Sequence, residues 1–230
     1  MRINSLTDIG SKRKDNQDNY WSAVLRVNET EEAGVICLCD GMGGLHNGGL
    51  ASKMVVEAVR SYMLSDFTFD GLEGVISSVN KEILDMSKGD KSLLMGTTCT
   101  VLLCYKGTYN IYHIGDSRAY VIRNGVASLL TTDHSAIQMY GIDKKTNPDL
   151  WNKYKNKLTR CIGVKEDIHL DYYNGLYQEG DVFFLCSDGC WHYFSDSPLV
   201  VDLAKDLNTL FQNCIANGET DNITAGVLFI

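Results

Sequence analysis

A short apolar run that ends at one acid and a glycine cluster is the feature that most constrains this sequence. Residues 34–39 are continuously apolar and partly β-branched, which is typical of a strand buried on both faces. Asp40 stands where that strand should end, glycines are frequent up to residue 49, and a helical pattern follows. Such a turn holds its acid rigidly and lets a ligand or metal approach the backbone. The stretch therefore predicts that Asp40 belongs to a ligand site, provided that other acids reach it.

Size and charge narrow the class of protein. A chain of 230 residues fits one domain, 1–230, and 44% hydrophobic content provides for a sizeable core. The net charge of −8 argues against nucleic-acid binding and against a polybasic membrane contact. No stretch reaches the roughly 18 apolar residues of a membrane span, and the first residues do not begin a signal peptide. We expect a cytoplasmic, monomeric protein with no membrane partner.

The cysteines predict buried free thiols rather than disulfides. Six of the eight lie in apolar, strand-like runs, with no CxxC pair and no His/Cys cluster at zinc spacing. Such thiols are usual in a reducing compartment. The six are Cys37, Cys39, Cys99, Cys104, Cys161 and Cys186.

The order of elements predicts an α+β fold. Helical periodicity is clear over 49–64 and 72–88, and a helical pair is expected within 197–216. The segment 133–160 is polar, lysine-rich and helical in part. Asn124-Gly125 predicts a type I′ hairpin turn between two strands. This is not the βαβ alternation of a parallel sheet, so we expect helices covering antiparallel sheets. The expected strands are 2–9, 19–27, 34–39, 96–105, 108–114, 117–123, 126–131, 168–174, 181–186 and 223–230.

Several acids share one local pattern. Each lies at or beside the end of an apolar strand, next to a small or turn-forming residue: Asp40, Asp116, Asp188 and Asp221, with Asp18 just before a strand. Any one alone is ordinarily a turn residue. As a set they would repel one another and need a compensating cation. If the strand ends meet, Mg²⁺ or Mn²⁺ is the natural partner, because the ligands are hard oxygens.

Arg13 is the second element of the expected site. It lies five residues before Asp18, in a polar loop that also carries Lys12 and Lys14. An arginine beside a carboxylate–metal site suits phosphate, because its planar fork binds two oxygens at once. A solvated loop arginine is the ordinary alternative.

Short motifs recur in one order from residue 8 to residue 224. They are Asp8-Ile9-Gly10 with Arg13, Asn16-Gln17-Asp18, Asp40-Gly41-Met42-Gly43-Gly44, Gly96-Thr97-Thr98, Gly115-Asp116-Ser117-Arg118, Asp133-His134-Ser135, Ser187-Asp188-Gly189 and Asp221-Asn222-Ile223-Thr224. Their order resembles the metal-dependent serine/threonine protein phosphatases of the PPM, or protein phosphatase 2C, family, in its bacterial form. The resemblance implies a four-layer α-β-β-α sandwich of two antiparallel sheets flanked by helices.

The resemblance also implies a metal centre and its ligands. Asp40 would bridge two Mn²⁺ or Mg²⁺ ions. The Gly41 carbonyl would bind one of these ions, and Asp188 and Asp221 the other. These three aspartates would be catalytic, because a water or hydroxide held between the ions would attack phosphorus directly.

Further roles follow from the same resemblance. Asp18 would act close to the metals through water, and Asp116, together with Asp188, would form a third, weaker metal site. Arg13 would be catalytic by holding the substrate phosphate, and Asn222 would orient the site. The substrates would be phosphoserine and phosphothreonine proteins, including a serine/threonine kinase and its targets. No cysteine is needed as a nucleophile, since no basic Cys-x5-Arg loop is present to activate Cys190.

The sequence departs from the family pattern in three places. Met42 replaces a histidine that animal-type members use to protonate the leaving group, so that role passes to water or another residue. His46 is near, although a histidine at a helix start is more often structural. Gln17 replaces an acid found in many members, which weakens one metal site. Residues 136–160 form a variant of the family's flap.

The flap variant is basic in an acidic protein. It carries several lysines and Arg160 against only Asp143 and Asp149. We expect it to steer and dock the phosphoprotein substrate; the alternative is a solvated loop and helix. The lysines are Lys144, Lys145, Lys153, Lys155 and Lys157.

Two other classes of function stay open at this point. One is a pseudophosphatase, an adaptor that binds phosphoproteins or a kinase without turnover. The presence of the strand-end acids together with Arg13 argues against it. The other is an unrelated metal-binding or structural protein in which those acids are turn residues. Metal-dependent phosphate ester hydrolysis distinguishes all three.

Overall fold

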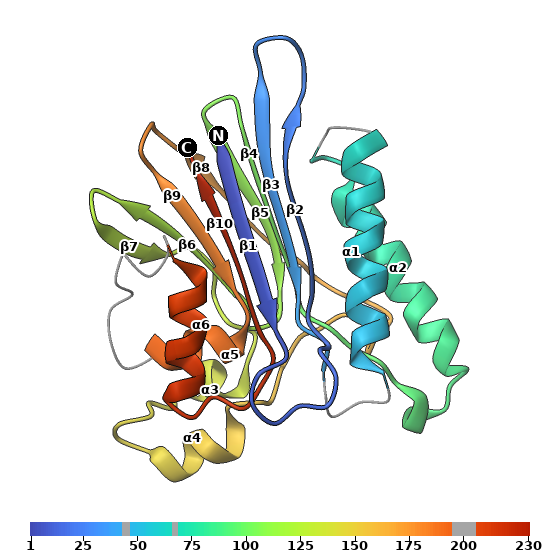
Figure 1. Ribbon diagram of the computed structural model, residues 1–230. Helices are drawn as coiled ribbons and strands as arrows, with labels where there is room; N and C mark the ends of the chain where they lie inside the picture. The colour runs from blue at the N-terminus through green and yellow to red at the C-terminus, as the bar shows by residue number, and fades with distance from the viewer. Residues whose placement is uncertain (43–46, 66–68, 195–205) are drawn as a thin grey trace.

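Two five-stranded antiparallel sheets pack face to face and carry helices on their outer faces (Figure 1). The computed structural model describes residues 1–42, 47–65, 69–194 and 206–230. The first sheet has the order β1-β10-β9-β6-β7 and the second has the order β2-β3-β4-β5-β8. This arrangement confirms the predicted α+β fold and the four-layer sandwich.

Most predicted strands form within a few residues of their expected bounds. In the first sheet these are β1 (Arg2–Asp8), β6 (Arg118–Arg123), β7 (Val126–Leu129), β9 (Val182–Cys186) and β10 (Ile223–Phe229). In the second sheet they are β2 (Asn19–Arg26), β3 (Glu32–Cys39), β4 (Cys99–Tyr105), β5 (Thr108–Ile114) and β8 (Asp171–Leu176). The turn between β6 and β7 has positive φ at both Asn124 and Gly125, as a type I′ turn requires.

The helices cover the two outer faces. The predicted pair α1 (Gly48–Ser65) and α2 (Leu72–Ser87) lies on the second sheet, and α5 (Asp188–Phe194) and α6 (Leu207–Ala216) lie on the first (Figure 1). The polar segment contains α3 (Ala136–Tyr140) and α4 (Pro148–Tyr154), as expected, and a 3₁₀ turn spans Lys91–Leu93. The sequence did not predict α5. Part of the helical pair expected within 197–216 lies outside the described residues.

Three hydrophobic layers separate the four layers of secondary structure. Strand β3 shows how one segment serves two of them, because successive side chains point to opposite faces. Val35, Cys37 and Cys39 pack toward α1 and α2. Ile36 and Leu38 pack between the sheets. The prediction of a strand buried on both faces is therefore confirmed.

Candidate functional site

The strand register brings the five predicted acids to one end of the sandwich. Asn19 pairs with Cys39, so Asp18 and Asp40 stand side by side where β2 begins and β3 ends. Ala225 pairs with Cys186, so the residues just before β10 and just after β9, Asp221 and Asp188, also meet. Asp116 follows β5, which ends at the same end of the sandwich. This end lies opposite the chain termini (Figure 1).

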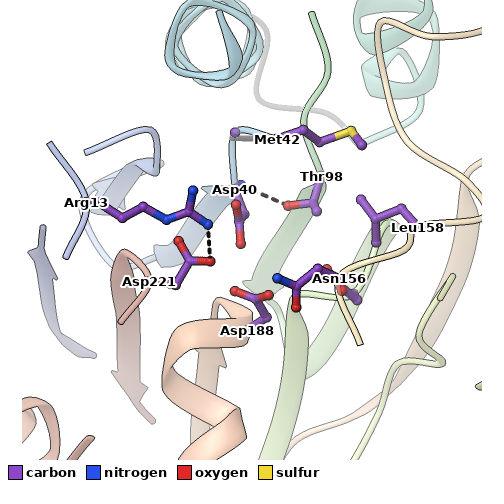
Figure 2. A pocket seen from close by; sticks show the side chains of 10 residues that line it. Arg13, Asp40, Met42, Thr98, Asn156, Leu158, Asp188 and Asp221 are labelled. Carbon is purple, nitrogen blue, oxygen red and sulfur yellow. Dashed lines mark hydrogen bonds and ion pairs between the residues drawn. The ribbon is translucent and has the colours of Figure 1, made fainter. Parts of the chain in front are cut away.

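These strand ends surround an open cavity of about 430 Å³ (Figure 2). Figure 2 shows the side chains of Asp40, Asp188 and Asp221 pointing toward one another inside it. Asp18 does not line the cavity. It is 5% exposed and lies behind the wall, where its Oδ2 accepts a hydrogen bond from Thr224 Oγ1 at 2.7 Å. The lining residues are Arg13, Asp40, Gly41, Met42, Thr98, Asp116, Asn156, Leu158, Asp188 and Asp221.

Loss of hydration and mutual repulsion raise the pKa values of Asp18, Asp40, Asp116 and Asp188. Burial is the main cause of the raised pKa of Asp40, followed by repulsion from the other four acids. Burial likewise raises the pKa of Asp116, with repulsion from Asp188 as the next cause. The pKa of Asp18 rises to about 7, mainly through burial. Carboxylates with these shifts are stabilised in their charged form by a nearby cation.

Unsatisfied oxygens also fit a cation. Asp18 Oδ1 and Asp188 Oδ1 are buried and have no hydrogen-bond partner, whereas buried carboxylate oxygens normally have one. Within the described ranges, no three of these acids offer oxygens that all lie within 4.8 Å of one another. Such spacing suits ions that keep several water ligands and contact only one or two carboxylates, as Mg²⁺ does. The donor set therefore fits hard, partly hydrated divalent ions.

The backbone of Asp40 is fixed by the two threonines that precede β4. Its N–H donates to Thr98 Oγ1 at 2.8 Å. Its carbonyl accepts from Thr97 Oγ1 and from the Thr98 N–H, both at 2.9 Å. The Thr98 hydroxyl in turn lies 2.9 Å from Ser117 Oγ, in the loop that carries Asp116. Two of the acid-bearing turns are thus linked through one hydroxyl.

Glycines act here through backbone packing. A Cβ at Gly41 would lie 2.5 Å from the carbonyl oxygens of Gln17 and Gly48. A Cβ at Gly189 would lie 2.2 Å from the carbonyl oxygen of Asn222. At position 41 the missing side chain lets the Asp18 loop and the start of α1 approach Asp40. Residues 43–46, including His46, lie outside the described residues.

Arg13 lies at the rim of the cavity and contacts a predicted metal ligand. Its Nη2 donates to Asp221 Oδ2 at 2.5 Å, and its side chain is 38% exposed. A guanidinium has five N–H donors, so this ion pair leaves others for a phosphate. Asn222 ties down the loop, because its amide donates to the carbonyls of Ile9 and Asp15 and accepts from the Gln17 N–H.

Asp116 is supported from the helix that the sequence did not predict. Trp191 of α5 donates its indole N–H to the Asp116 carbonyl at 2.8 Å. Arg118 lies over the Trp191 ring, 3.6 Å from its centroid. The Arg118 guanidinium also forms a two-pronged ion pair with the buried Asp133. These contacts hold the Asp116 turn against α5.

Sequence reasoning missed three neighbours of the site. Glu219 accepts hydrogen bonds from the backbone N–H groups of Thr220 and Asp221, at 2.7 and 2.9 Å. Asn156 and Leu158 bring the basic segment to the cavity wall (Figure 2). An acid two residues before Asp221 was the only available signal for Glu219, and nothing in the sequence marked Asn156.

Two departures from the family pattern can now be located. Met42 lines the cavity, so a thioether stands where a proton donor was expected in animal-type members. Gln17 takes part through its backbone. Its carbonyl accepts from the Gly41 N–H and the Ser52 hydroxyl, and its side chain is not among the described lining groups.

Comparisons with known proteins agree with this geometry. Residues 11–224 match the family described as protein phosphatase 2C. The chain is 31% identical over 243 residues to the protein phosphatase PhpP of Streptococcus pneumoniae, covering 99% of this chain and 97% of that protein. It is 30% identical over 241 residues to the serine/threonine phosphatase stp of Listeria monocytogenes, covering 97% and 94%. The solved structure of the serine/threonine phosphatase Stp1 from Staphylococcus aureus superposes with a TM-score of 0.83 at 25% identity, covering 99% and 94%.

Proposed function

Because the chain belongs to the protein phosphatase 2C family of metal-dependent serine/threonine phosphatases, we propose that the cavity around Asp40 is its catalytic centre. There it hydrolyses phosphoserine and phosphothreonine esters of other proteins. The observation that carries the proposal is the convergence of four cavity-lining aspartates with Arg13 at the rim. Two of the acids, Asp18 behind the wall and Asp188 in it, carry buried oxygens without a protein partner.

The residues divide between two principal cation positions. Asp40 would contribute to both, the Gly41 carbonyl would be a ligand at one, and Asp188 and Asp221 would be ligands at the other. Mn²⁺ and Mg²⁺ suit the site, because every candidate ligand is oxygen. Asp116, with Asp188, would provide ligands for a third and weaker position. Asp18 lies behind the cavity wall and would act on the ions through water.

Each protein group has a distinct task in the reaction. Bound divalent ions supply a hydroxide nucleophile near neutral pH and neutralise charge on the phosphoryl group. Arg13 binds two phosphoryl oxygens with N–H groups that Asp221 does not use, and so orients phosphorus for in-line attack. Thr98 keeps Asp40 in place while charge is redistributed. Met42 has no proton to give, so the leaving alkoxide would take its proton from water or from another residue.

The proposal extends to partners and location. Phosphoproteins are the substrates, and a serine/threonine kinase together with its targets is the expected set. The basic segment supports docking of an acidic phosphoprotein, since Asn156 and Leu158 join its lysines to the cavity wall. All eight cysteines are free, which fits a reducing compartment such as the cytoplasm. Among the described helices, none has the length and apolar character needed to cross a membrane.

Hydrolysis of p-nitrophenyl phosphate and of a phosphothreonine peptide tests the proposal. We expect activity that requires Mn²⁺ and disappears with EDTA. Asp40→Asn and Asp188→Asn should each lower kcat/KM by more than about 100-fold, since even outer partners of metal ligands cost 10–100-fold. Arg13→Ala should raise KM about 10- to 100-fold, the value of a charged hydrogen bond.

Asp85→Asn is the matched control, because Asp85 is exposed on α2 and lies away from the cavity. Calorimetric Mn²⁺ binding gives a second readout that does not depend on turnover. Wild-type protein that is inert with both Mn²⁺ and Mg²⁺ yet binds the phosphopeptide would instead support the pseudophosphatase. Full activity in Asp40→Asn would exclude the proposed centre.

A further inference from the structure

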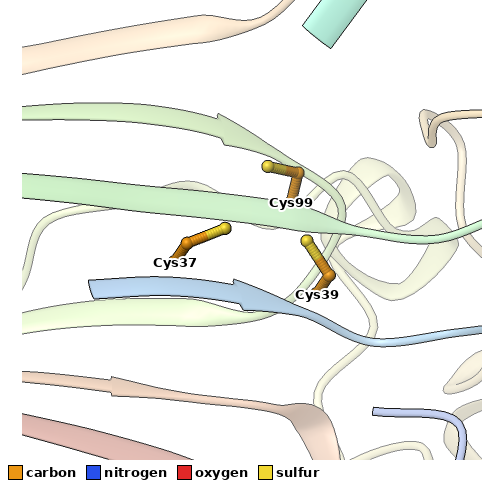
Figure 3. A group of neighbouring side chains, drawn as sticks. All are labelled: Cys37, Cys39 and Cys99. Carbon is orange, nitrogen blue, oxygen red and sulfur yellow. The ribbon is translucent and has the colours of Figure 1, made fainter. Parts of the chain in front are cut away.

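Three cysteines converge on the helix-facing side of the second sheet, just behind the cavity. Cys37 and Cys39 are two residues apart on β3 and share one face. Leu38 pairs with Thr100 of β4, so continuing the antiparallel register by one residue brings Cys99 opposite Cys39. Figure 3 shows the sulfurs of Cys37 and Cys39 pointing from β3 toward β4, with the sulfur of Cys99 on the far side of the β4 ribbon in this view. Spacing along the sequence did not indicate this cluster, because a Cys-x-Cys pair and a distant cysteine meet only through strand pairing.

The spacing of the sulfurs suits one metal ion. All three Sγ atoms lie within 4.8 Å of one another, and none of the three residues is more than 1% exposed. A metal with bonds of about 2.3 Å to three sulfurs in a plane separates them by about 4 Å. Small shifts of the side chains therefore complete the coordination. Across the described ranges, no other set of three His, Cys, Asp or Glu residues meets this spacing.

We propose that Cys37, Cys39 and Cys99 form a binding site for a single Cu(I) ion. Sulfur ligands select soft metals, of which Cu(I) and Zn²⁺ are the common candidates. Structural zinc is almost always held by four ligands, and the group described here contains three. Cu(I) is satisfied by three sulfurs, so the number of ligands favours it.

The surroundings support binding of a soft ion rather than of a hydrated hard one. The cluster belongs to the hydrophobic layer between the second sheet and helices α1 and α2. Each sulfur that binds as thiolate releases its proton to solvent. The monovalent ion then offsets one such charge inside the protein.

The site is connected to the proposed catalytic centre through two peptide bonds. Cys39 immediately precedes Asp40, and Thr98, which holds the Asp40 amide, immediately precedes Cys99. Drawing the sulfurs together pulls on the strand ends that carry both residues. Bound Cu(I) therefore changes the Mn²⁺ dependence of hydrolysis. This consequence rests on the proposed function, whereas Cu(I) binding itself does not.

Anaerobic titration of the full chain with Cu(I), in competition with a colorimetric Cu(I) chelator, tests the site. We expect one equivalent per chain, proton release on binding, and an X-ray absorption spectrum with sulfur ligands at about 2.3 Å. Because the sulfurs are buried, the ion reaches them slowly. Each reading is therefore taken only after the signal has become constant. Cys37→Ala, Cys39→Ala and Cys99→Ala should each weaken binding by more than about 100-fold, since a direct ligand is lost.

Cys104→Ala is the matched control. Cys104 is a buried cysteine on the same strand as Cys99, but it packs between the sheets. Circular dichroism establishes that each variant is folded, and serine at the same position replaces any alanine variant that is not. The proposal is overturned if wild-type protein and Cys99→Ser bind Cu(I) equally, if Cys104→Ala removes binding, or if Zn²⁺ is preferred over Cu(I). If the wild-type protein and all variants lack phosphatase activity, the catalytic proposal is refuted. The titration still tests Cu(I) binding, because it does not depend on turnover.

Discussion

Replacing Thr98 with valine isolates the contact that fixes Asp40 at the end of β3. Thr98 Oγ1 accepts the Asp40 N–H at 2.8 Å and also lies 2.9 Å from Ser117 Oγ. Thr98 and Ser117 are each 1% exposed, so the Asp40 amide loses its partner inside the protein. A buried donor left unpaired costs about 1–3 kcal/mol. Valine keeps the Cγ2 methyl that packs over Gly115, so the lost hydroxyl accounts for the change in stability.

The same substitution should weaken metal activation. The Asp40 carboxylate stands among acids that repel it, and its backbone is then held through the carbonyl alone. We expect Thr98→Val to lower the free energy of unfolding by about 1–3 kcal/mol. The Mn²⁺ concentration for half-maximal activity should rise about 10- to 100-fold, the usual effect of losing a group that supports a metal ligand. Saturating Mn²⁺ should restore most of kcat.

Urea denaturation and Mn²⁺ titrations of p-nitrophenyl phosphate hydrolysis measure the two effects separately. Thr98→Ser keeps the hydroxyl and is the matched control, expected near wild type in Mn²⁺ activation. If the serine variant is as impaired as the valine variant, the methyl rather than the hydroxyl is responsible and the reasoning fails. It fails equally if the valine variant needs no more Mn²⁺ than wild type.

Two further predictions concern stability and substrate docking. Burial, followed by repulsion from His134, lowers the pKa of His113 to about 3. Below about pH 6.5, His113 is therefore protonated in the unfolded chain but stays neutral in the folded chain. Stability is therefore full above pH 6.5 and falls by about 2 kcal/mol between pH 7 and pH 5; urea denaturation should show a flatter profile for His113→Gln, and an unchanged profile would contradict the assignment. Glutamine at four lysines of the basic segment should raise KM for phosphopeptides but not for p-nitrophenyl phosphate, and equal effects on both substrates would refute docking. The four are Lys144, Lys145, Lys153 and Lys155.

Local patterns in the sequence predicted the strands and the acids. Each strand corresponds to a local apolar run, and each acid lies next to the end of such a run. Apolar runs such as 34–39 identify buried strands, and a strand end next to a glycine identifies a turn that carries an acid. Once β3 pairs with β2 and β4, Asp40 must lie beside Asp18 and close to Thr98. The meeting of the acids therefore follows from topology, and the sequence could indicate it without any coordinates.

Contacts made through tertiary packing could not be predicted in this way. Helix α5 starts at Asp188 within a segment whose Asp-Gly pair is a common turn dipeptide, so turn propensity concealed it. Trp191 then reaches the Asp116 carbonyl from that helix. The three-cysteine cluster depends on a strand register that spacing along the chain does not reveal. Arg160 looked like part of a basic docking face, but it forms an ion pair with Asp171 at 2.7 Å.

The alternation of β3 places the two proposed metal sites on opposite faces of the same strand. Even-numbered residues Ile36 and Leu38 face the layer between the sheets, and Asp40 continues that face into the cavity (Figure 2). The odd-numbered Cys37 and Cys39 face the helices. The cavity is thus the open, acidic end of the layer between the sheets, where the proposed divalent ions would bind. The sulfur cluster lies on the other face of the same sheet, in an apolar layer that suits a soft ion. The two proposed sites lie on opposite faces of the end of β3. A shift of this strand end at either site would therefore move Asp40.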